Sequence, residues 1–312
     1  MHIPSLSLSL SLLLPFTAAA AALQGFNYGS TNPDGSCRRY SDFKTLFQRA
    51  QHLTGTSTFT AAHLYTSIQC GTTDAPTEAF RAAVDTNTKL VVGLWASSTG
   101  FDKEMKALMA VANNKNVADQ VVAISVGSED LYRNSPQGKA NGEGVGASAE
   151  ALVGYIGWLR DWLKGSLMQG KKVMHADTWS AWVLPENKKV IEAVDVLGHN
   201  SFPYFEDTRP DNSIDRASDN FWQAVAATEA VAMGKPVWIT ETGWPVSGPK
   251  RGKAIASIAN AKKYWHTIGC SLFGKRNTFW YTLADVNVAQ TQLSFGVTPV
   301  DSATPKFDLR CS

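Results

Sequence analysis

Hydrophobic and polar positions alternate along this chain in blocks that predict strands and helices in turn. Short apolar runs rich in β-branched residues, such as KLVVGLWAS at 89–97, have the length and composition of buried strands. Longer segments between these runs carry apolar residues at helical spacing, as Leu152, Ile156 and Leu159 do. The pattern therefore predicts a strand–helix unit that repeats along the chain.

Near-continuous apolar strands indicate a parallel sheet that is buried on both faces. Strands are expected at 23–30, 58–68, 89–97, 121–129, 172–179, 195–205, 236–244 and 277–285. Helices are expected at 37–53, 76–87, 101–113, 147–170, 185–194, 214–234 and 254–273. Eight such strands favour a single-domain α/β fold, the closed (β/α)8 TIM barrel, over an open doubly wound sheet. The strands are also followed by neither a G-x-G-x-x-G turn nor a phosphate loop.

The composition and net charge of the chain limit the kinds of molecule that it is expected to bind. The 312 residues are 44% hydrophobic and 18% charged, which is ordinary for a globular protein with a large core. The net charge of +2 gives no basic footprint, so we expect no nucleic-acid partner. We expect the protein to act as a monomer.

Residues 1–22 have the pattern of a secretory signal peptide, with a Leu- and Ser-rich apolar run followed by alanines. A transmembrane anchor is the alternative, but the run is short and interrupted by serine. The mature domain would then be 23–312, secreted to the extracellular space or cell wall. The polar C-terminal sequence PKFDLRCS gives no signal for a lipid anchor, and we expect no membrane anchor.

Four cysteines in an exported chain suggest two disulfides, for which three connectivities exist. We favour Cys37–Cys70, which would tie the start of an early helix to the loop after the next strand. The second bond, Cys270–Cys311, would tie the last helix to the C-terminus. No Cys-x-x-Cys pair occurs and the six histidines are scattered, so we expect neither a metal site nor a cofactor.

Two apolar strands end in a glutamate. VWITETGWP at 237–245 places Glu241 between Trp238 and Trp244, and VVAISVGSE ends at Glu129. A single glutamate at such a place is more often a surface residue that caps a strand. Paired carboxylates at the ends of two strands, however, are the minimum requirement for glycoside hydrolysis.

In TIM barrels the active site lies at the C-terminal ends of the strands. This rule selects aromatic, amide and carboxyl side chains, which stack on sugar rings and hydrogen-bond to hydroxyl groups. The residues expected to bind substrate are Tyr28, Tyr65, Ser128, Asp177, Trp179, Asn200, Tyr204, Trp244 and Trp280.

The stretches VVAISVGSE and WITETGWP resemble glycoside hydrolase family 17, the β-1,3-glucanases, and particularly its secreted fungal branch. GFNYGS, HLYTSIQC, LVVGLWAS, NSFPYF and FWYTLAD also fall where that family has strand ends, so the resemblance covers the mature chain. The resemblance implies a retaining glucan endo-1,3-β-glucosidase that acts on β-glucan polysaccharide. It further implies that Glu129 is the general acid/base and Glu241 the nucleophile.

These two roles require different environments. Glu129 must hold a proton near neutral pH, whereas Glu241 must be ionised and needs donors such as the hydroxyls of Tyr204 or Tyr65. Retention predicts a carboxyl separation of about 5–5.5 Å. Two positions depart from the family pattern: Ser128 stands where many relatives have Asn, and His63 stands where they have Arg. We expect His63 to be a core residue.

Two other functions stay open at this point. A β-1,3-glucanosyltransferase that remodels cell-wall glucan would share the covalent intermediate and differ only in the acceptor that attacks it. A non-catalytic glucan-binding cell-wall protein would not need two carboxylates at strand ends.

Overall fold

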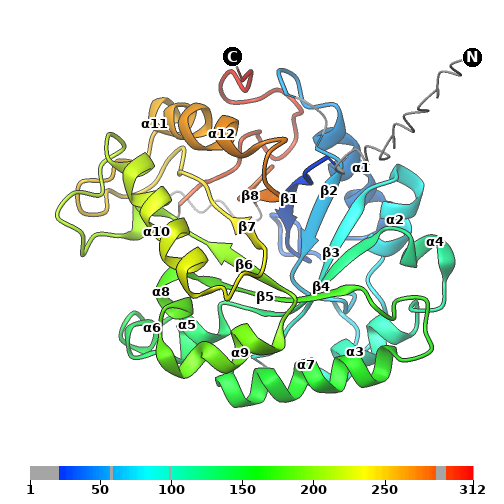
Figure 1. Cartoon of the computed structure of the whole chain (residues 1–312). Coiled ribbons are helices and arrows are strands. Elements are labelled where there is room, and N and C mark those ends of the chain that lie inside the picture. Colours follow the sequence, from blue (N-terminus) through cyan, green and yellow to red (C-terminus); the bar gives the residue numbers. More distant parts are fainter. Residues whose placement is uncertain (1–20, 57–58, 98–99, 286–292, 312) are drawn as a thin grey trace, which may run out of the picture.

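The computed structural model describes residues 21–56, 59–97, 100–285 and 293–311. Within these ranges, eight parallel strands close into a barrel in sequence order, with β1 paired to both β2 and β8. Helices surround the barrel on its outer side (Figure 1). The predicted single-domain TIM barrel is therefore confirmed. The predicted signal peptide, at 1–22, lies almost wholly outside the described residues.

The strands are short, and most of the covering helices lie between consecutive strands. The strands are β1 (Gln24–Tyr28), β2 (Ala61–Leu64), β3 (Lys89–Leu94), β4 (Val121–Ser128), β5 (Lys172–Thr178), β6 (Val196–Asn200), β7 (Val237–Glu241) and β8 (Thr278–Trp280). The α-helices are α1 (Tyr40–Gln51), α2 (Ala79–Thr86), α3 (Phe101–Met109), α4 (Lys115–Ala118), α5 (Asp130–Asn134), α6 (Pro136–Ala140), α7 (Ala149–Leu163), α8 (Trp179–Trp182), α9 (Lys188–Ala193), α10 (Ala217–Val231), α11 (Ile258–Tyr264) and α12 (Cys270–Leu272). The remaining helical turns are η1 (Pro185–Asn187), η2 (Pro203–Phe205) and η3 (Trp265–Gly269).

One apolar layer inside the barrel is made of side chains from neighbouring strands. The layer consists of Ala61, Val91, Ala123, Met174, Val196, Trp238 and Phe279, one residue from each of β2 to β8. On β1 the matching position is Gly25, where an added Cβ would lie 2.3 Å from the Ala61 carbonyl oxygen. Glycine is therefore required there, and the layer fills the barrel toward the N-terminal ends of the strands.

A second, larger core lies between the barrel and its helices. On α1, Phe43 and Phe47 are buried four residues apart, which places both on the side that faces the barrel. On α7, Leu152, Ile156 and Leu159 do the same, as their helical spacing predicts. Strand residues therefore face either the interior layer or this outer core, and the alternation between the two decides which side chains reach the site.

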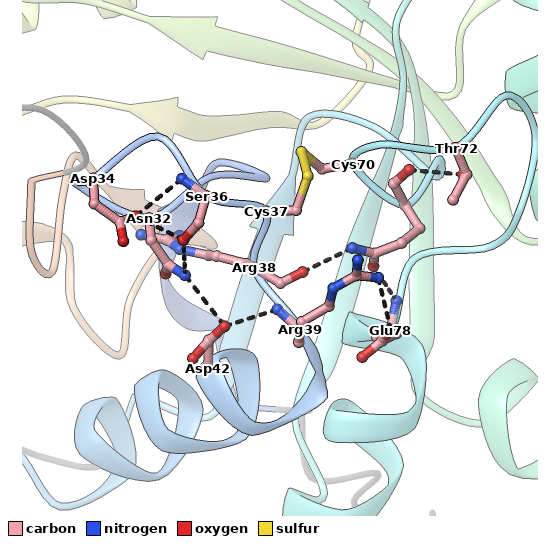
Figure 2. Close-up of a disulfide and its surroundings, with 11 residues drawn as sticks. Asn32, Asp34, Ser36, Cys37, Arg38, Arg39, Asp42, Cys70, Thr72 and Glu78 are labelled. Atoms are coloured by element: carbon pink, nitrogen blue, oxygen red, sulfur yellow. Dashed lines mark hydrogen bonds and ion pairs between the residues drawn. A yellow bond between two sulfur atoms is a disulfide. The ribbon is translucent and has the colours of Figure 1, made fainter.

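Two disulfides close loops in the predicted pairing. Cys37–Cys70 has a Cα–Cα distance of 5.2 Å, and Cys270–Cys311 one of 5.3 Å. Figure 2 shows how the first bond joins the segment before α1 to the loop after β2. Around it, the Arg39 guanidinium donates to Glu78 at 3.3 Å, and the Arg39 backbone N–H donates to Asp42 at 2.8 Å. The loop that follows β2, and begins at Tyr65, is thereby fixed to the start of α1.

The segment after β4 differs from the prediction. The sequence pattern predicts no helix between the strand at 121–129 and the helix at 147–170, but this segment contains the short helices α5 and α6. Ser135 begins α6, and its hydroxyl accepts the Gly138 N–H at 3.1 Å. In the part of the chain that the structure describes, no helix has the length and apolar character that crossing a bilayer requires.

Candidate active site

Glu129 stands at the end of β4 in an unusual backbone conformation. Its φ of 58° and ψ of 25° lie in the left-handed region, and it directly precedes α5. Its backbone N–H donates to the Ala176 carbonyl of β5 at 2.8 Å. Non-glycine residues held in this region carry backbone strain, which is often found at functional sites. The turn directs the half-buried side chain of Glu129 toward β6, where Asn200 Nδ2 donates to its Oε1 at 3.0 Å.

Two buried carboxylates stabilise the turn that carries Glu129 and the helix that follows it. Asp130 Oδ2 accepts the Ser128 backbone N–H at 2.9 Å. At Gly127, with φ of +77°, a Cβ would lie 2.1 Å from this same oxygen, so a glycine is needed there. Asp177 accepts the backbone N–H groups of Leu131 and of Tyr132, which belong to the first turn of α5.

Asp177 was predicted to contact substrate, and this prediction needs correction. The side chain is fully buried, and besides the two α5 amides it accepts the Thr178 N–H at 2.8 Å and bonds His175 Nε2 at 2.8 Å. Burial alone would lower the pKa of His175, but the hydrogen bond and charge of Asp177 raise it. Asp177 therefore holds the helix next to Glu129 and has no oxygen free at the surface.

Glu241 ends β7 and is 7% exposed. The Tyr65 hydroxyl, at the end of β2, donates to Glu241 Oε1 at 2.8 Å. The sequence suggested Tyr65 or Tyr204 as this donor, and the structure selects Tyr65. The two glutamates therefore have separate hydrogen-bond donors, a phenol for Glu241 and an amide for Glu129.

Burial and mutual repulsion govern the ionisation of the two glutamates. Burial raises the pKa of Glu129 to about 7, against the hydrogen bond from Asn200, which lowers it. Burial and the charge of Glu129 raise the pKa of Glu241 well above its ordinary value, while the Tyr65 hydroxyl and Arg133 oppose the shift. Two buried carboxyl groups that interact in this way lose their first proton far more easily than their second. The pair can therefore hold one proton and one negative charge near neutral pH.

Arg133 of α5 is a site residue that the sequence analysis missed. Its Nη2 donates to the Ser97 hydroxyl at 3.0 Å and to the Ser128 carbonyl at 2.5 Å. Its guanidinium carbon lies 4.9 Å from the centre of the Trp95 ring. Its charge lowers the pKa of both glutamates. Arg133 lies between the predicted strand at 121–129 and the predicted helix at 147–170, where no element was expected, so the sequence gave no signal for its role.

Two predicted sugar-binding aromatics lie on the wrong face of their strands. Trp280 is 2% exposed and packs in the outer core, with its ring 4.9 Å from that of Trp265 in η3. Tyr28 is 4% exposed and packs edge-on against Phe47 of α1 at 5.1 Å. Both side chains point toward the covering helices, so neither can stack on a sugar at the barrel mouth.

Two further predicted contacts are buried within the loops above the strands. Tyr204 is fully buried, and its hydroxyl donates to the Pro249 carbonyl. Trp244 packs against Tyr204 with ring centres 5.5 Å apart, and its Nε1 donates to the Ile255 carbonyl at 3.0 Å. Tyr204 and Trp244 therefore hold together the segments that follow β6 and β7, and the predicted contact of these two side chains with substrate is wrong.

Trp179 keeps its predicted place at the mouth of the barrel. It is half-buried, its Nε1 donates to Glu206 Oε1 at 2.8 Å, and the Arg209 guanidinium lies 5.3 Å from its ring centre. Ser128 is 5% exposed and lies next to Glu129 at the end of β4. The roles of these two residues in substrate binding stay predictions.

Tyr281 takes the place near the carboxyl pair that the sequence analysis gave to Trp280. Burial and the negative charge of Glu241 raise the pKa of Tyr281. Its ring lies 5.7 Å from Phe202 and 5.3 Å from Phe295, which form an aromatic cluster with it. Strict alternation from Phe279, which faces the barrel interior, would have identified Tyr281 as the next inward residue.

His63 is fully buried, as expected, and its Nδ1 lies 2.8 Å from Asn27 Oδ1. Burial lowers the pKa of His63 to about 4, so the ring is neutral at physiological pH. Among the described residues, no group of three or more His, Cys, Asp or Glu side chains could hold a metal ion. A cavity of about 550 Å³ lined by residues such as Lys235, Trp238 and Asn277 opens at the N-terminal ends of β7 and β8, away from the carboxyl pair.

Comparison with known proteins finds a matching family model and similar proteins. A family model described as BtgE/BtgC glycoside hydrolase domain matches residues 25–298. The probable glucan endo-1,3-beta-glucosidase eglC of Aspergillus fumigatus is 48% identical over 305 residues, which cover 97% of this chain and 68% of that protein. The glucan 1,3-beta-glucosidase of Saccharomyces cerevisiae is 28% identical over 268 residues, which cover 82% and 80%. This chain thus spans about two thirds of the length of the Aspergillus relative.

Among solved structures, the glycoside hydrolase family 17 β-1,3-glucanosyltransferase of Rhizomucor miehei is similar to this fold. The TM-score is 0.73 with 25% sequence identity, and the match covers 93% of this chain and 98% of that one. An active-site mutant of the same enzyme in complex with laminaritriose gives a TM-score of 0.72.

Proposed function

This chain belongs to the BtgE/BtgC glycoside hydrolase family, as its resemblance to glycoside hydrolase family 17 predicted, and we propose that it hydrolyses β-1,3-glucosidic bonds in β-glucan with retention of configuration. One observation carries the proposed mechanism. Two glutamates, half-buried Glu129 and buried Glu241, end β4 and β7, and each has its own hydrogen-bond donor. The names of the relatives support the choice of a β-1,3-glucan as substrate.

In the first step, the Glu241 carboxylate attacks the anomeric carbon while protonated Glu129 gives its proton to the departing glycosidic oxygen. The bond from that carbon to the leaving oxygen breaks, and a glycosyl ester of Glu241 forms. In the second step, ionised Glu129 takes a proton from water, and the resulting hydroxide attacks the same carbon and releases Glu241. The raised pKa of Glu129 fits both of its roles, because it can hold and accept a proton near neutral pH.

The test uses laminarin and its short oligosaccharides. Proton NMR of the first product should show the β-anomer before mutarotation, since retention requires two displacements at the same carbon. Glu241→Gln should abolish the release of reducing sugar while its circular dichroism spectrum matches that of the wild type. An α-anomer formed first, or full activity of Glu241→Gln, would overturn the assignment of Glu241 as nucleophile.

Transfer to a second glucan is the rival reaction, and the similarity to the Rhizomucor miehei glucanosyltransferase is the observation in its favour. Water and a sugar hydroxyl compete for the same glycosyl ester, so the outcome depends on how tightly the acceptor binds. A time course with laminarin oligosaccharides separates the two: products longer than the substrate indicate transfer. Binding to laminarin with no change in its length distribution would instead favour a non-catalytic glucan-binding protein.

The proposal includes export of the protein. Residues 1–22 would be removed as a signal peptide, and 23–312 would form a monomeric catalytic domain outside the cell or in its wall. The two disulfides support an oxidising destination, since such bonds are rare in the cytosol. N-terminal sequencing of protein recovered from culture medium, and light scattering of the purified chain, test the cleavage site and the monomeric state.

A further inference from the structure

Asn200 connects the proposed acid/base to a buried threonine. Its Nδ2 donates to Glu129 Oε1 at 3.0 Å, and its Oδ1 accepts the Thr240 hydroxyl at 2.7 Å. Asn200 is 1% exposed and Thr240 is fully buried, so water does not compete for the bond between them. The two residues lie on the adjacent strands β6 and β7, and Thr240 directly precedes Glu241.

The Thr240 hydroxyl has one further consequence for the amide. An asparagine amide can present either its NH2 group or its oxygen to a neighbour. If Asn200 turned over, its oxygen would face Glu129 and its NH2 group would face Thr240. The Thr240 hydroxyl hydrogen would then be buried without an acceptor, because Asn200 is its hydrogen-bond partner within the described part of the chain. A buried donor without an acceptor is costly, so the hydroxyl selects the observed orientation.

We propose that Thr240 is a positioning residue that keeps the Asn200 amide turned to donate to Glu129, and thereby stabilises the ionised form of Glu129. An ionised carboxylate can only accept, so it is stabilised by the amide N–H of the observed orientation. A protonated carboxyl could instead donate its O–H to the amide oxygen, which requires the opposite amide orientation. The orientation therefore acts on the step in which Glu129 must be ionised to accept a proton from water. This inference rests on the proposed role of Glu129.

Other groups also act on Glu129, from each element around it. They are Glu241 on β7, Asp177 on β5, Tyr65 after β2, Arg133 and Tyr132 on α5, Glu143 after α6 and Tyr281 after β8. The Thr240 hydroxyl forms no hydrogen bond with these groups within the described residues. Removal of the hydroxyl alone should therefore change the Asn200 bond and leave the remaining charges in place.

The experiment measures pH profiles of kcat/KM on laminarin for Thr240→Val, which keeps the shape and removes the hydroxyl, and for Thr240→Ser, which keeps the hydroxyl. In Thr240→Val, the Asn200 amide can turn its oxygen toward protonated Glu129. The alkaline limb of the kcat/KM profile should therefore shift to higher pH by about half to one unit. Thr240→Ser should keep the wild-type profile. Thr278→Val is the matched control, since its buried hydroxyl donates to the Arg276 carbonyl at the far end of the barrel.

Further measurements separate positioning from general damage. A structural defect would lower kcat/KM at every pH without moving the limb, and this result for Thr240→Val would overturn the inference. An equal shift in Thr240→Ser would overturn it as well. If Thr240→Val folds poorly, a double-mutant cycle with Asn200→Ala provides the test. In the Asn200→Ala background, Thr240→Ser and Thr240→Ala should have the alkaline limb of kcat/KM at the same pH. A difference between them would contradict the proposal.

A reference variant keeps the two proposals distinct. Glu129→Gln should lose activity on laminarin and keep activity on an aryl laminaribioside with a good leaving group, with the alkaline limb absent. If Glu129→Gln retains the wild-type limb, the proposed role of Glu129 fails. If Glu129→Gln behaves as expected and Thr240→Val does not shift, only the inference about Thr240 fails.

Discussion

The Tyr65 hydroxyl donates a 2.8 Å hydrogen bond to Oε1 of Glu241. This bond is the counterpart of the one between Asn200 and Glu129, and it gives the two glutamates different electrostatic surroundings. Burial raises the pKa of Glu241, and the phenol opposes that shift by stabilising the carboxylate. Each glutamate therefore has one donor that stabilises its carboxylate: an amide on β6 for Glu129 and a phenol directly after β2 for Glu241.

Tyr65→Phe removes this donor and keeps the ring. A hydrogen bond to a charged group contributes enough that kcat/KM should fall about 10- to 100-fold. The pKa of Glu241 should rise, so the acid limb of the profile should move to higher pH, because Glu241 must be ionised to attack. The measurement is the pH profile of laminarin hydrolysis. Tyr204→Phe is the control: its hydroxyl donates to Pro249, and the acid limb should not move.

Stability should depend on pH through the same pair. The pKa of Glu129 is raised from 4.5 to about 7 in the folded protein, so folding favours its protonated form. This contribution is fully present below pH 4.5 and is lost as the pH rises through 7. Glu129→Gln, a neutral side chain of the same shape, should therefore be more stable than the wild type at pH 8 by about 1–3 kcal/mol. At pH 4 the two should unfold at the same urea concentration.

A matched exposed glutamate provides the control for this prediction. Glu186→Gln changes the same functional group on the exposed turn η1 and should give no gain at pH 8. Equal stability of Glu129→Gln and wild type at both pH values would contradict the argument that burial raises the pKa of Glu129.

Asp177→Asn should damage the site without touching substrate. The carboxylate accepts backbone N–H groups from the first turn of α5, and an amide NH2 in its place would oppose one of these donors. We expect a loss of about 2–4 kcal/mol in unfolding free energy and at least a tenfold drop in kcat/KM at a temperature where the variant is folded. Urea unfolding and laminarin kinetics measure the two effects.

Asp195→Asn is the corresponding control, because Asp195 precedes β6 and contacts the opposite, N-terminal end of β5. Asp195 Oδ2 accepts the Val173 N–H at 2.8 Å, so this variant also loses a carboxylate that caps a backbone group. It should lose stability and keep the wild-type kcat/KM. If Asp177→Asn also kept its kcat/KM, then the position of α5 would not matter for Glu129.

The barrel and the carboxyl pair could be predicted from the sequence because their signals are local. Apolar runs gave the strands, and Glu129 and Glu241 each follow such a run directly. Tyr65 was predicted on the same basis and lies at the site. The αL turn at Glu129 and the helix after it could not be predicted, since Asp177 and Asp130 stabilise them from elsewhere in the fold.

The errors at Tyr28 and Trp280 share one physical cause. Barrel strands are buried on both faces, so the sequence does not distinguish a residue that faces inward from its neighbour that faces the helices. Trp280 was chosen where Tyr281 faces the site, and Tyr28 was chosen where Asn27 faces inward. A shift of one residue along a strand exchanges the two faces. The pairing of the strands in the folded barrel fixes which residues face inward, so the structure was needed to place these side chains.

Trp179 and Trp280 offer a direct test of this distinction. Trp179 is half-buried at the mouth, where Glu206 holds its indole N–H and leaves the ring in place to stack on a sugar. Trp179→Ala should raise KM for laminarin about tenfold with little change in kcat, because stacking stabilises bound substrate and transition state alike. Trp280→Phe should instead lower the melting temperature and leave KM unchanged, since Trp280 packs against Trp265 in the outer core. An unchanged KM in Trp179→Ala would remove Trp179 from the substrate-binding residues, and a raised KM in folded Trp280→Phe would contradict the outward orientation of Trp280.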